Sequence, residues 1–584
     1  MKKASIHIVC MLLALVSLPQ LLSGQQAPEA SLLRSPLFRE KLMLTTDRTL
    51  YAAGERILFR VFNFSDSLLK EDHWSMVLYL ELISERHVAV ARGKFTLAAE
   101  GASGQLTIPD SVTTGNYVLR AYTRWMRNFT ADAFATLSLG VVNPDRTGPV
   151  ELFSAVPDSL LPGSNEHIPG SMPGRRTAAT GISLKTEHSL YRKGEQVTLL
   201  LQTDESPRPE GGYALSVVRK AFLDLDQQGL STIGRATIGD DGIVAYPPDT
   251  RGISVSGTIV QRTGRQPVPF ARMHVTLLGE TPDYYEMSAD QQGNVRFSVP
   301  ARPGVSNALI AFDREKGASF ELVVDEAFSR EFAETRDPGP GIINRQPGAT
   351  RELAMISQLR KAFDLQPERN ESSADSLSNT LFYGTPEYRY RTADYVAIPN
   401  LGEFLFELVP QVAVQRVQGQ RILSVMDDAG YFLEYAPLIL LDHVNIQDME
   451  ALLAIDPEQL STIDVVNTIY IRGSNIYGGI ISLISREGNL AGVGLPEGAT
   501  IIELQTVVGL DDLAPQDFIP PSRGERLPDL RSTLFWDPDV ELRSGEQRSL
   551  EFPASDIPGT YVAILTGVTQ EGKVIRSACE FDVE

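Results

Sequence analysis

One short sequence motif occurs twice in the chain and constrains its fold more than any other feature. Tyr51 is followed by Gly54 in the first copy, and Tyr191 is followed by Gly194 in the second. The offset, 191 − 51 = 140 residues, is the size of a domain and far exceeds a solenoid repeat. In both copies alternating apolar residues flank the glycine, which is typical of two strands joined by a turn. We therefore expect two related β domains.

The first copy lies in a region of short, evenly spaced apolar runs. Turns containing Gly or Asn separate these runs, which occupy residues 56–62, 76–83, 88–97, 117–122 and 135–142. Short strands at this spacing predict an antiparallel β-sandwich over residues 38–143. Residues 144–179 are rich in Pro and Gly and are predicted to be a linker.

The first copy resembles the macroglobulin-type β-sandwich of the α2-macroglobulin and complement family, whose members carry a D-R-x-x-Y-x-x-G-E signature. Residues 47–55 fit that signature, whereas the second copy has Glu187 and His188 at its first two positions. The resemblance implies two domains of this fold. Trapping macroglobulins also use a Cys-Gly-Glu-Gln thioester, but Cys579 is followed by Glu580. Covalent trapping is therefore not expected.

The second sandwich is predicted to be split in sequence. Its first part offers only three strands, at residues 181–186, 196–203 and 214–219. A sandwich of this kind needs about seven strands to cover both inner faces. The C-terminal tail offers four more, at residues 533–537, 547–552, 560–569 and 574–583. The tail also resembles the family in its W-x-P step and D-x-x-x-x-Y strand, and family members interrupt one such domain. We therefore expect residues 180–225 and 530–584 to form one sandwich.

Two further modules lie between these halves. Residues 250–328 resemble the transthyretin-like, carboxypeptidase regulatory-like sandwich through P-V-P-F-A at 267–271 and a D-x-x-G turn at 290–293. That module is an accessory fold and implies no peptidase. Residues 329–395 are predicted to be a linker that contains a helix at 351–363.

Residues 396–490 resemble the plug domain of TonB-dependent receptors. Apolar runs at 438–446, 463–470 and 480–485 are predicted to share one small mixed sheet, with helices near 401–408 and 448–453. His443 replaces the usual turn glycine, and Asn467 with Thr468 replaces a basic-Gly step. A 22-stranded receptor barrel needs roughly 220 residues. Only 584 − 485 = 99 residues follow the last run, so no barrel is expected in this chain.

The N-terminus has the pattern of a signal peptide at residues 1–24. Lys2 and Lys3 precede an apolar run, and Gln25 rather than Cys follows the small residues before it, so a lipoprotein is not expected. Cys579 is then the one cysteine of the mature chain, which predicts no intrachain disulfide. No other run is long and apolar enough for a transmembrane helix. We expect export to the periplasm or the outer membrane of a Gram-negative bacterium.

Neither charge nor motifs indicate catalysis. The net charge of −21 disfavours binding of nucleic acid and anionic lipid, and is interpreted as serving solubility rather than a specific acidic binding surface.

Residues 224–229 are interpreted as a solvated turn rather than a calcium loop, because Arg235 stands where an EF-hand needs Glu. None of the histidines outside the leader has metal-ligand spacing, so surface or turn positions are predicted for His73, His87, His167, His188, His274 and His443.

We therefore expect a mainly β, multidomain, exported protein with antiparallel β-sandwiches and a small α+β plug-like domain. No catalytic, cofactor-binding or metal-binding residue is predicted, no cofactor is expected, and no binding residues are identified. The leading hypothesis is a non-enzymatic envelope binding or scaffold protein that recognises a protein or peptide. One alternative is an accessory component of a TonB-dependent uptake complex, with an outer-membrane barrel or a TonB-type coupler as partner. Another is a protease-binding inhibitor without a thioester.

Overall fold

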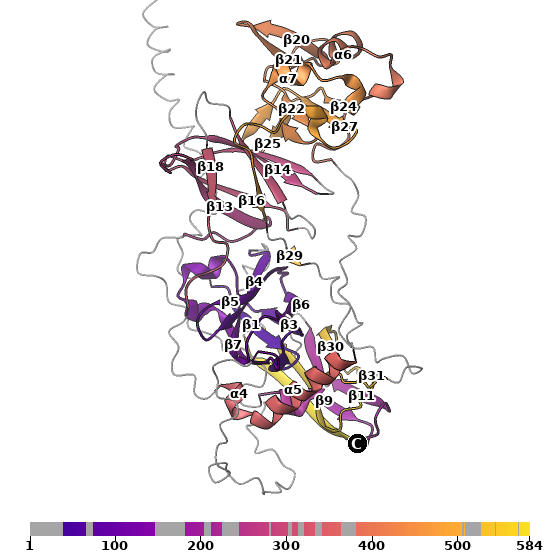
Figure 1. Cartoon of the computed structure of the whole chain (residues 1–584). Helices are drawn as coiled ribbons and strands as arrows, with labels where there is room; N and C mark the ends of the chain where they lie inside the picture. The colour runs from indigo at the N-terminus through magenta and orange to yellow at the C-terminus, as the bar shows by residue number, and fades with distance from the viewer. Residues whose placement is uncertain are drawn as a thin grey trace, which may run out of the picture. The chain divides into compact units, whose positions relative to one another are not determined.

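The computed structural model confirms a mainly β chain with several antiparallel sheets (Figure 1). Two compact units are formed, the first from Met1–Thr250, Arg330–Pro367 and Leu510–Glu584, and the second from Arg251–Ser329 and Glu368–Gly509. The structure describes residues 39–65, 74–146, 181–203, 212–224, 245–279, 282–301, 307–313, 320–332, 341–363, 381–504, 507–508, 527–543, 545–569 and 572–584. The predicted leader at 1–24 and most of the predicted linker at 144–179 lie outside these residues.

The first sandwich of the first unit has two sheets. One has the order β1-β3-β6, with β1 at Leu42–Thr46, β3 at Arg56–Asn63 and β6 at Gly101–Thr107. The other runs β2 (Leu50–Ala52), β8 (Ala135–Val142), β7 (Gly115–Tyr122), β4 (Val77–Ser84) and β5 (Ala89–Thr96). Short 3-10 turns at Trp125–Asn128 and Ala131–Ala133 connect β7 to β8. In the described part of these sheets the short pair β2–β8 is parallel, and the chain turns at Gly54, with φ +84°, between β2 and β3.

The second sandwich joins strands from both ends of the predicted split. The earlier strands are β9 (Ile182–Thr186), β10 (Leu190–Tyr191), β11 (Gln196–Thr203) and β12 (Tyr213–Arg219). The later strands are β30 (Thr533–Val540), β31 (Gln547–Pro553), β32 (Gly559–Val568) and β33 (Val574–Val583). β11 lies between β9 and β31, and β12 lies between β30 and β32. The expected contact between the two halves is thus confirmed, and Figure 1 shows β9 and β11 beside the yellow C-terminal strands.

The alternation of buried and less buried residues along β11 explains why the two halves of the sandwich must pack together. Val197, Leu199 and Leu201 are fully buried, while the residues between them are less covered. They pack in one core cluster with Leu565 and Phe581 from the tail. The sequence duplication is also visible in the strands, because β10 pairs in parallel with β33 as β2 pairs with β8.

Two helices close the first unit. α4 (Ile342–Arg345) and α5 (Pro347–Ala362) contribute Ile343 and Leu353 to a cluster that includes Leu50 and Phe222. The predicted helix at 351–363 is therefore present but begins earlier, because Pro347 suits the first helical position, where no N–H partner is needed. Although this helix was expected within a linker, it packs on both sandwiches of its unit.

The second unit contains a third sandwich. One sheet has the order β16 (Asn294–Val299), β13 (Ile253–Gln261) and β18 (Phe320–Val324). The other runs β15 (Asp283–Ser288), β14 (Arg272–Leu278), β17 (Asn307–Phe312) and β28 (Thr500–Glu503). β28 lies beyond both predicted ranges, 250–328 and 396–490, and still completes this sheet by pairing with β17.

Residues 381–499 of the second unit form what we call the α+β block. Its main sheet runs β19 (Tyr388–Arg391), β24 (Leu460–Val466), β27 (Ile480–Ser485), β22 (Leu438–Leu441) and β23 (Val444–Asn445). β27 is parallel to β22 and antiparallel to β24, so the three predicted runs share a mixed sheet, although the middle one ends at Val466.

Helices and two hairpins complete the block. α6 (Leu401–Leu408) and α7 (Met449–Leu453) lie where helices were predicted, each with an N-cap side chain, Asn400 and Asp448. The hairpins are β20 (Val412–Val417) with β21 (Gln420–Val425), and β25 (Tyr470–Arg472) with β26 (Asn475–Tyr477). The short strand β29 (Val507–Val508) follows the block.

Candidate functional site

The first copy of the signature forms a buried joint between the first two sandwiches. The Asp47 carboxylate accepts hydrogen bonds from the Tyr51 hydroxyl at 2.6 Å and from Thr533 Oγ1 of the second sandwich at 2.6 Å. Its backbone carbonyl accepts a further bond from Ser216 Oγ at 2.7 Å. Burial raises the pKa of Asp47, while Arg48 and these hydrogen bonds act in the opposite direction. The signature therefore serves packing rather than chemistry.

Glu55 completes this joint. One carboxylate oxygen accepts hydrogen bonds from Arg48 Nη2 at 3.0 Å and from the backbone N–H of Ala52 at 2.7 Å. The other accepts a bond from Arg360 of α5 at 2.8 Å. Gly54, in the turn between β2 and β3, has φ +84°, a backbone conformation that residues with a side chain rarely adopt.

The second copy keeps the buried tyrosine, Tyr191, and the turn. Glu195 accepts a hydrogen bond from the backbone N–H of Arg192 at 2.7 Å, as Glu55 does from Ala52. Glu187 and His188, which replace the first two signature residues, are exposed. The two copies thus share a fold, but only the first makes the joint.

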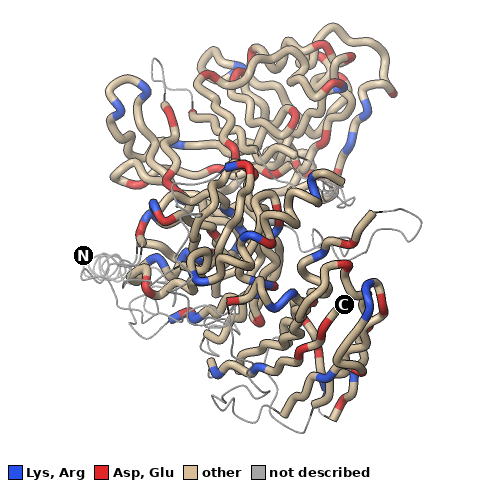
Figure 2. The backbone as a smooth tube through the Cα atoms, turned by 60° about the horizontal axis from the view of Figure 1, so that its bottom comes forward, with Lys and Arg blue, Asp and Glu red and all other residues tan. Residues whose placement is uncertain are grey.

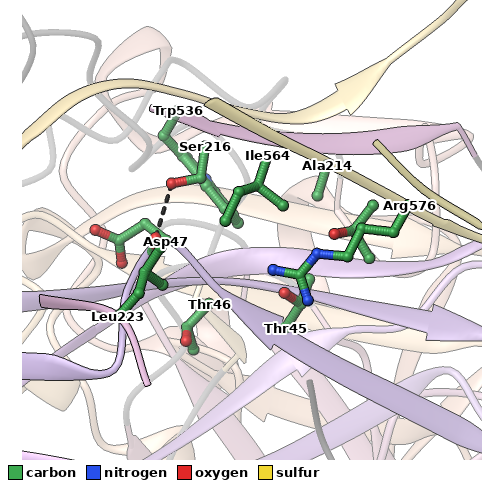
Figure 3. Close-up of a pocket in the computed structure, with 10 residues that line it drawn as sticks. Thr45, Thr46, Asp47, Ala214, Ser216, Leu223, Trp536, Ile564 and Arg576 are labelled. Atoms are coloured by element: carbon green, nitrogen blue, oxygen red, sulfur yellow. Dashed lines mark hydrogen bonds between the residues drawn. The ribbon is translucent and has the colours of Figure 1, made fainter. Parts of the chain in front are cut away.

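A small pocket lies beside this joint (Figure 3). It is lined by Thr45, Thr46, Asp47, Ala214, Ser216, Leu223, Trp536, Ile564, Thr566 and Arg576. The guanidinium of Arg576 extends into it, and burial lowers the pKa of that group to about 10. The space holds roughly one water molecule, so the pocket is too small for an organic ligand.

A buried polar network in the second unit has the outline of a catalytic relay. His274 Nδ1 lies 2.7 Å from the Tyr284 hydroxyl, and its Nε2 lies 2.7 Å from the Asp313 carboxylate. However, burial, followed by the neighbouring Tyr477 and Glu286, raises the pKa of Tyr284 far above its usual value. A buried phenol that holds its proton is a poor nucleophile.

This network instead attaches the α+β block to the third sandwich. Gln447 Nε2 donates to the Phe312 carbonyl at 3.3 Å, Arg472 Nε donates to the Tyr284 carbonyl at 2.6 Å, and Asn475 Nδ2 donates to the Glu286 carbonyl at 2.8 Å. Tyr284 also shares a core cluster with residues of the block's main sheet. Because β28 returns from the block into the sandwich, the block is fixed both by backbone pairing and by side chains.

The histidine predictions were partly wrong. His274 is buried on β14 rather than placed at the surface, because Tyr284 and Asp313 satisfy both ring nitrogens. His87 and His443 are in turns with positive φ, and burial lowers the pKa of His443. His188 is exposed as expected. His73 and His167 lie outside the described residues, as do residues 225–229 of the calcium-like turn.

The block carries a group of exposed apolar side chains that sequence reasoning missed. Two segments bear them, residues 427–437 and residues 467–478, and we call the group the apolar face. Its members are exposed by 42% to 73% and are Tyr431, Phe432, Tyr435, Ile469, Ile471 and Ile476. Asn467 Nδ2 donates to Asp428 at 2.7 Å, and the Gly478 N–H donates to the Ala436 carbonyl at 2.9 Å. These bonds hold the two segments side by side.

Other sites are not apparent among the described residues. No group of three or more His, Cys, Asp or Glu side chains is arranged there to hold a metal ion. Within the same residues, no helix has the length and apolar character needed to cross a membrane. Cys579 is half-buried on β33, and burial raises the pKa of its thiol to about 11, which makes it unreactive.

Comparison with known proteins does not assign a family. No family model matches the chain, and no curated protein matches it. Among solved structures, it is similar to Salmonella alpha-2-macroglobulin reacted with methylamine, with 10% identity over 94% of this chain and 39% of that one and a TM-score of 0.21.

Two other solved structures give a comparable result. E. coli alpha-2-macroglobulin in its native conformation has 11% identity over 94% of this chain and 40% of that one, with a TM-score of 0.21. Dimeric latent PorU from Porphyromonas gingivalis has 10% identity over 49% and 34%, with a TM-score of 0.16. The chain thus spans about two fifths of these macroglobulins. TM-scores this low support no functional transfer.

Proposed function

We propose that this protein is a non-enzymatic binding scaffold of the bacterial envelope that recognises a protein partner through the apolar face. The observation that carries this proposal is the exposure of six large apolar side chains on two segments held together by hydrogen bonds. Single exposed apolar residues are ordinary, but a group of them on one surface marks an interaction site. Aromatic side chains such as Tyr431 and Phe432 are also typical anchors of protein interfaces.

The way the block is held supports a scaffold role. β28 and the network around His274 fix it to the third sandwich, so the apolar face is presented on an ordered support. A rigid binding surface loses less conformational entropy when a partner binds. In the first unit, the split second sandwich and the Asp47 joint serve the same purpose for the macroglobulin-type domains that the signature implies.

The buried polar groups serve packing, which favours a non-enzymatic role. The pocket beside Asp47 has room for about one water molecule. The His274 network is buried and its hydrogen bonds are used in packing.

Export is proposed from the signal-peptide pattern at residues 1–24. Mass spectrometry of the secreted chain tests it, and a mature N-terminus at Gln25 is expected, whereas a retained Met1 would contradict it.

A second function is favoured by one feature of the block. Its mixed sheet, with β22 parallel and β24 antiparallel to β27, agrees with the plug-like domain that the sequence resembles. We therefore keep as an alternative an accessory role in TonB-dependent uptake. Recovery of an outer-membrane barrel or a TonB-type coupler with the chain would favour this alternative over a general scaffold.

Co-purification with matched variants tests the proposal. The double variant Tyr431→Ser/Ile471→Ser removes two of the most exposed members of the apolar face. Phe406→Ser removes a side chain of equal exposure on α6 and serves as the control. A partner that remains with the wild type and the control but is lost from the double variant supports the proposal. Partners that remain with all three proteins would show that the apolar face is not the binding site.

A further inference from the structure

We infer that the partner segment that covers the apolar face is a cationic, apolar polypeptide segment. This inference rests on the proposed function, because it names the chemistry of the segment that binds. Three observations lead to it: the charge of the α+β block, the carboxylates beside the apolar face, and the commitment of the nearby arginine to other contacts.

The block is strongly acidic for its size. Residues 381–499 contain 6 Lys and Arg against 15 Asp and Glu, a net charge of 6 − 15 = −9. The whole chain carries −21, with 74 Asp and Glu against 53 Lys and Arg. Figure 2 marks the acidic positions in red and the basic positions in blue along the backbone. A surface of one sign attracts partners of the opposite sign and repels nucleic acid and anionic lipid.

Carboxylates lie on one of the two segments that bear the apolar face. Asp427, Asp428 and Glu434 belong to the same segment as the three aromatic residues. Hydrogen bonds from the Tyr388 hydroxyl and from Asn467 lower the pKa of Asp428, so it stays charged at neutral pH. Asp427 accepts bonds from the backbone N–H groups of Ala429 and Tyr431, which fixes the turn that presents the aromatic rings.

No cation of the two segments is available to neutralise these carboxylates. Residues 427–437 contain no Lys or Arg, and residues 467–478 contain only Arg472. The Arg472 guanidinium donates to the Tyr284 carbonyl, pairs with Asp283 and packs over the rings of Tyr285 and Phe382. The two segments therefore supply no positive charge of their own to complement these carboxylates, and we assign that charge to the partner.

Lysine or arginine on an apolar segment matches this surface in two ways. The ammonium or guanidinium group interacts with exposed carboxylates and with aromatic faces, and the apolar side chains cover the isoleucines. Because Asp428 and Glu434 are exposed, the electrostatic contribution is screened by salt. Binding should therefore weaken as ionic strength rises, while the apolar contribution remains.

Fluorescence anisotropy with the full chain and three labelled peptides tests the inference. Each peptide is about 12 residues long and alternates Lys with Leu, Glu with Leu, or Lys with Ser. We expect the Lys–Leu peptide to bind about tenfold more tightly than either of the others at about 50 mM salt, and to weaken about tenfold at about 500 mM salt. Equal affinity for the Lys–Leu and Lys–Ser peptides would overturn the inference, because charge alone would explain it.

Variants separate failure of this inference from failure of the proposed function. Tyr431→Ser/Ile471→Ser should reduce Lys–Leu binding about tenfold, and Glu434→Gln should reduce it about threefold with a weaker salt effect. Phe406→Ser should leave it unchanged. If the Glu–Leu peptide binds as well and is lost in the double variant, the binding face stands and its cationic preference is wrong. If the double variant binds the Lys–Leu peptide like the wild type, both are contradicted.

Discussion

Asp47 shows how a single buried carboxylate can join two domains. It fits the D-R-x-x-Y-x-x-G-E signature of the sequence, but its partners Ser216 and Thr533 are 169 and 486 residues away and carry no local signal. Asp47→Ala should destabilise the first unit by about 2–4 kcal/mol, because it leaves buried donors unpaired. Glu187→Ala, at the equivalent exposed position, should change stability by less than about 0.5 kcal/mol. Urea denaturation measures both, and equal effects would contradict the joint.

At the residue scale, the buried Glu40 should also make the stability of the folded protein depend on pH. Burial raises the pKa of its carboxyl from 4.5 to about 7, the hydrogen bond from Thr123 opposes this shift, and the charge of Asp249 adds to it. The folded state therefore favours the protonated form. This stabilisation is fully present below about pH 4.5, is lost as pH rises through about 7, and amounts to about 3 kcal/mol in full.

The conservative variant isolates this effect from other titrating groups. Glu40→Gln cannot ionise, so the difference in unfolding free energy between wild type and variant should shift by about 2–3 kcal/mol between pH 4.5 and pH 7. Urea denaturation at several pH values gives that difference. A constant difference across this range would mean that Glu40 titrates normally in the folded protein.

At the scale of elements, long apolar runs were predictable and short edge strands were not. β22, β24 and β27 were expected because each is a buried run of β-branched and aliphatic residues. β28 was missed because it has four residues that are mostly exposed, and β10 has only two. The exposed apolar side chains were missed for a related reason: an apolar residue in a sequence normally signals burial.

β28 provides a matched pair of neighbouring positions. Ile502 packs against the core of the third sandwich, whereas Ile501 is 56% exposed on the other side of the strand. Ile502→Ser should destabilise the second unit by about 1–2 kcal/mol, and Ile501→Ser by less than about 0.5 kcal/mol. Thermal unfolding monitored by circular dichroism measures the difference. Equal effects would show that β28 does not contribute to that core.

At the scale of the whole molecule, the split sandwich makes two distant segments of the chain, residues 182–219 and 533–583, depend on each other. Removal of residues 527–584 should expose the apolar side of β11 and leave β11 and β12 without their partners in β31, β30 and β32. Hydrogen exchange should then become fast in β11 and β12 but remain slow in β4 and β7 of the first sandwich. Unchanged protection of β11 would contradict a shared core.

Site-specific photo-cross-linking most directly tests the claim that the apolar face binds a protein partner. A photoreactive phenylalanine derivative replaces Tyr431 in one variant and Phe406 in another, so that two side chains of matched exposure are compared in the cells that produce the protein. The account predicts a defined cross-linked partner from position 431 and none from position 406. Absence of cross-linking at 431, or the same products from both positions, would contradict it.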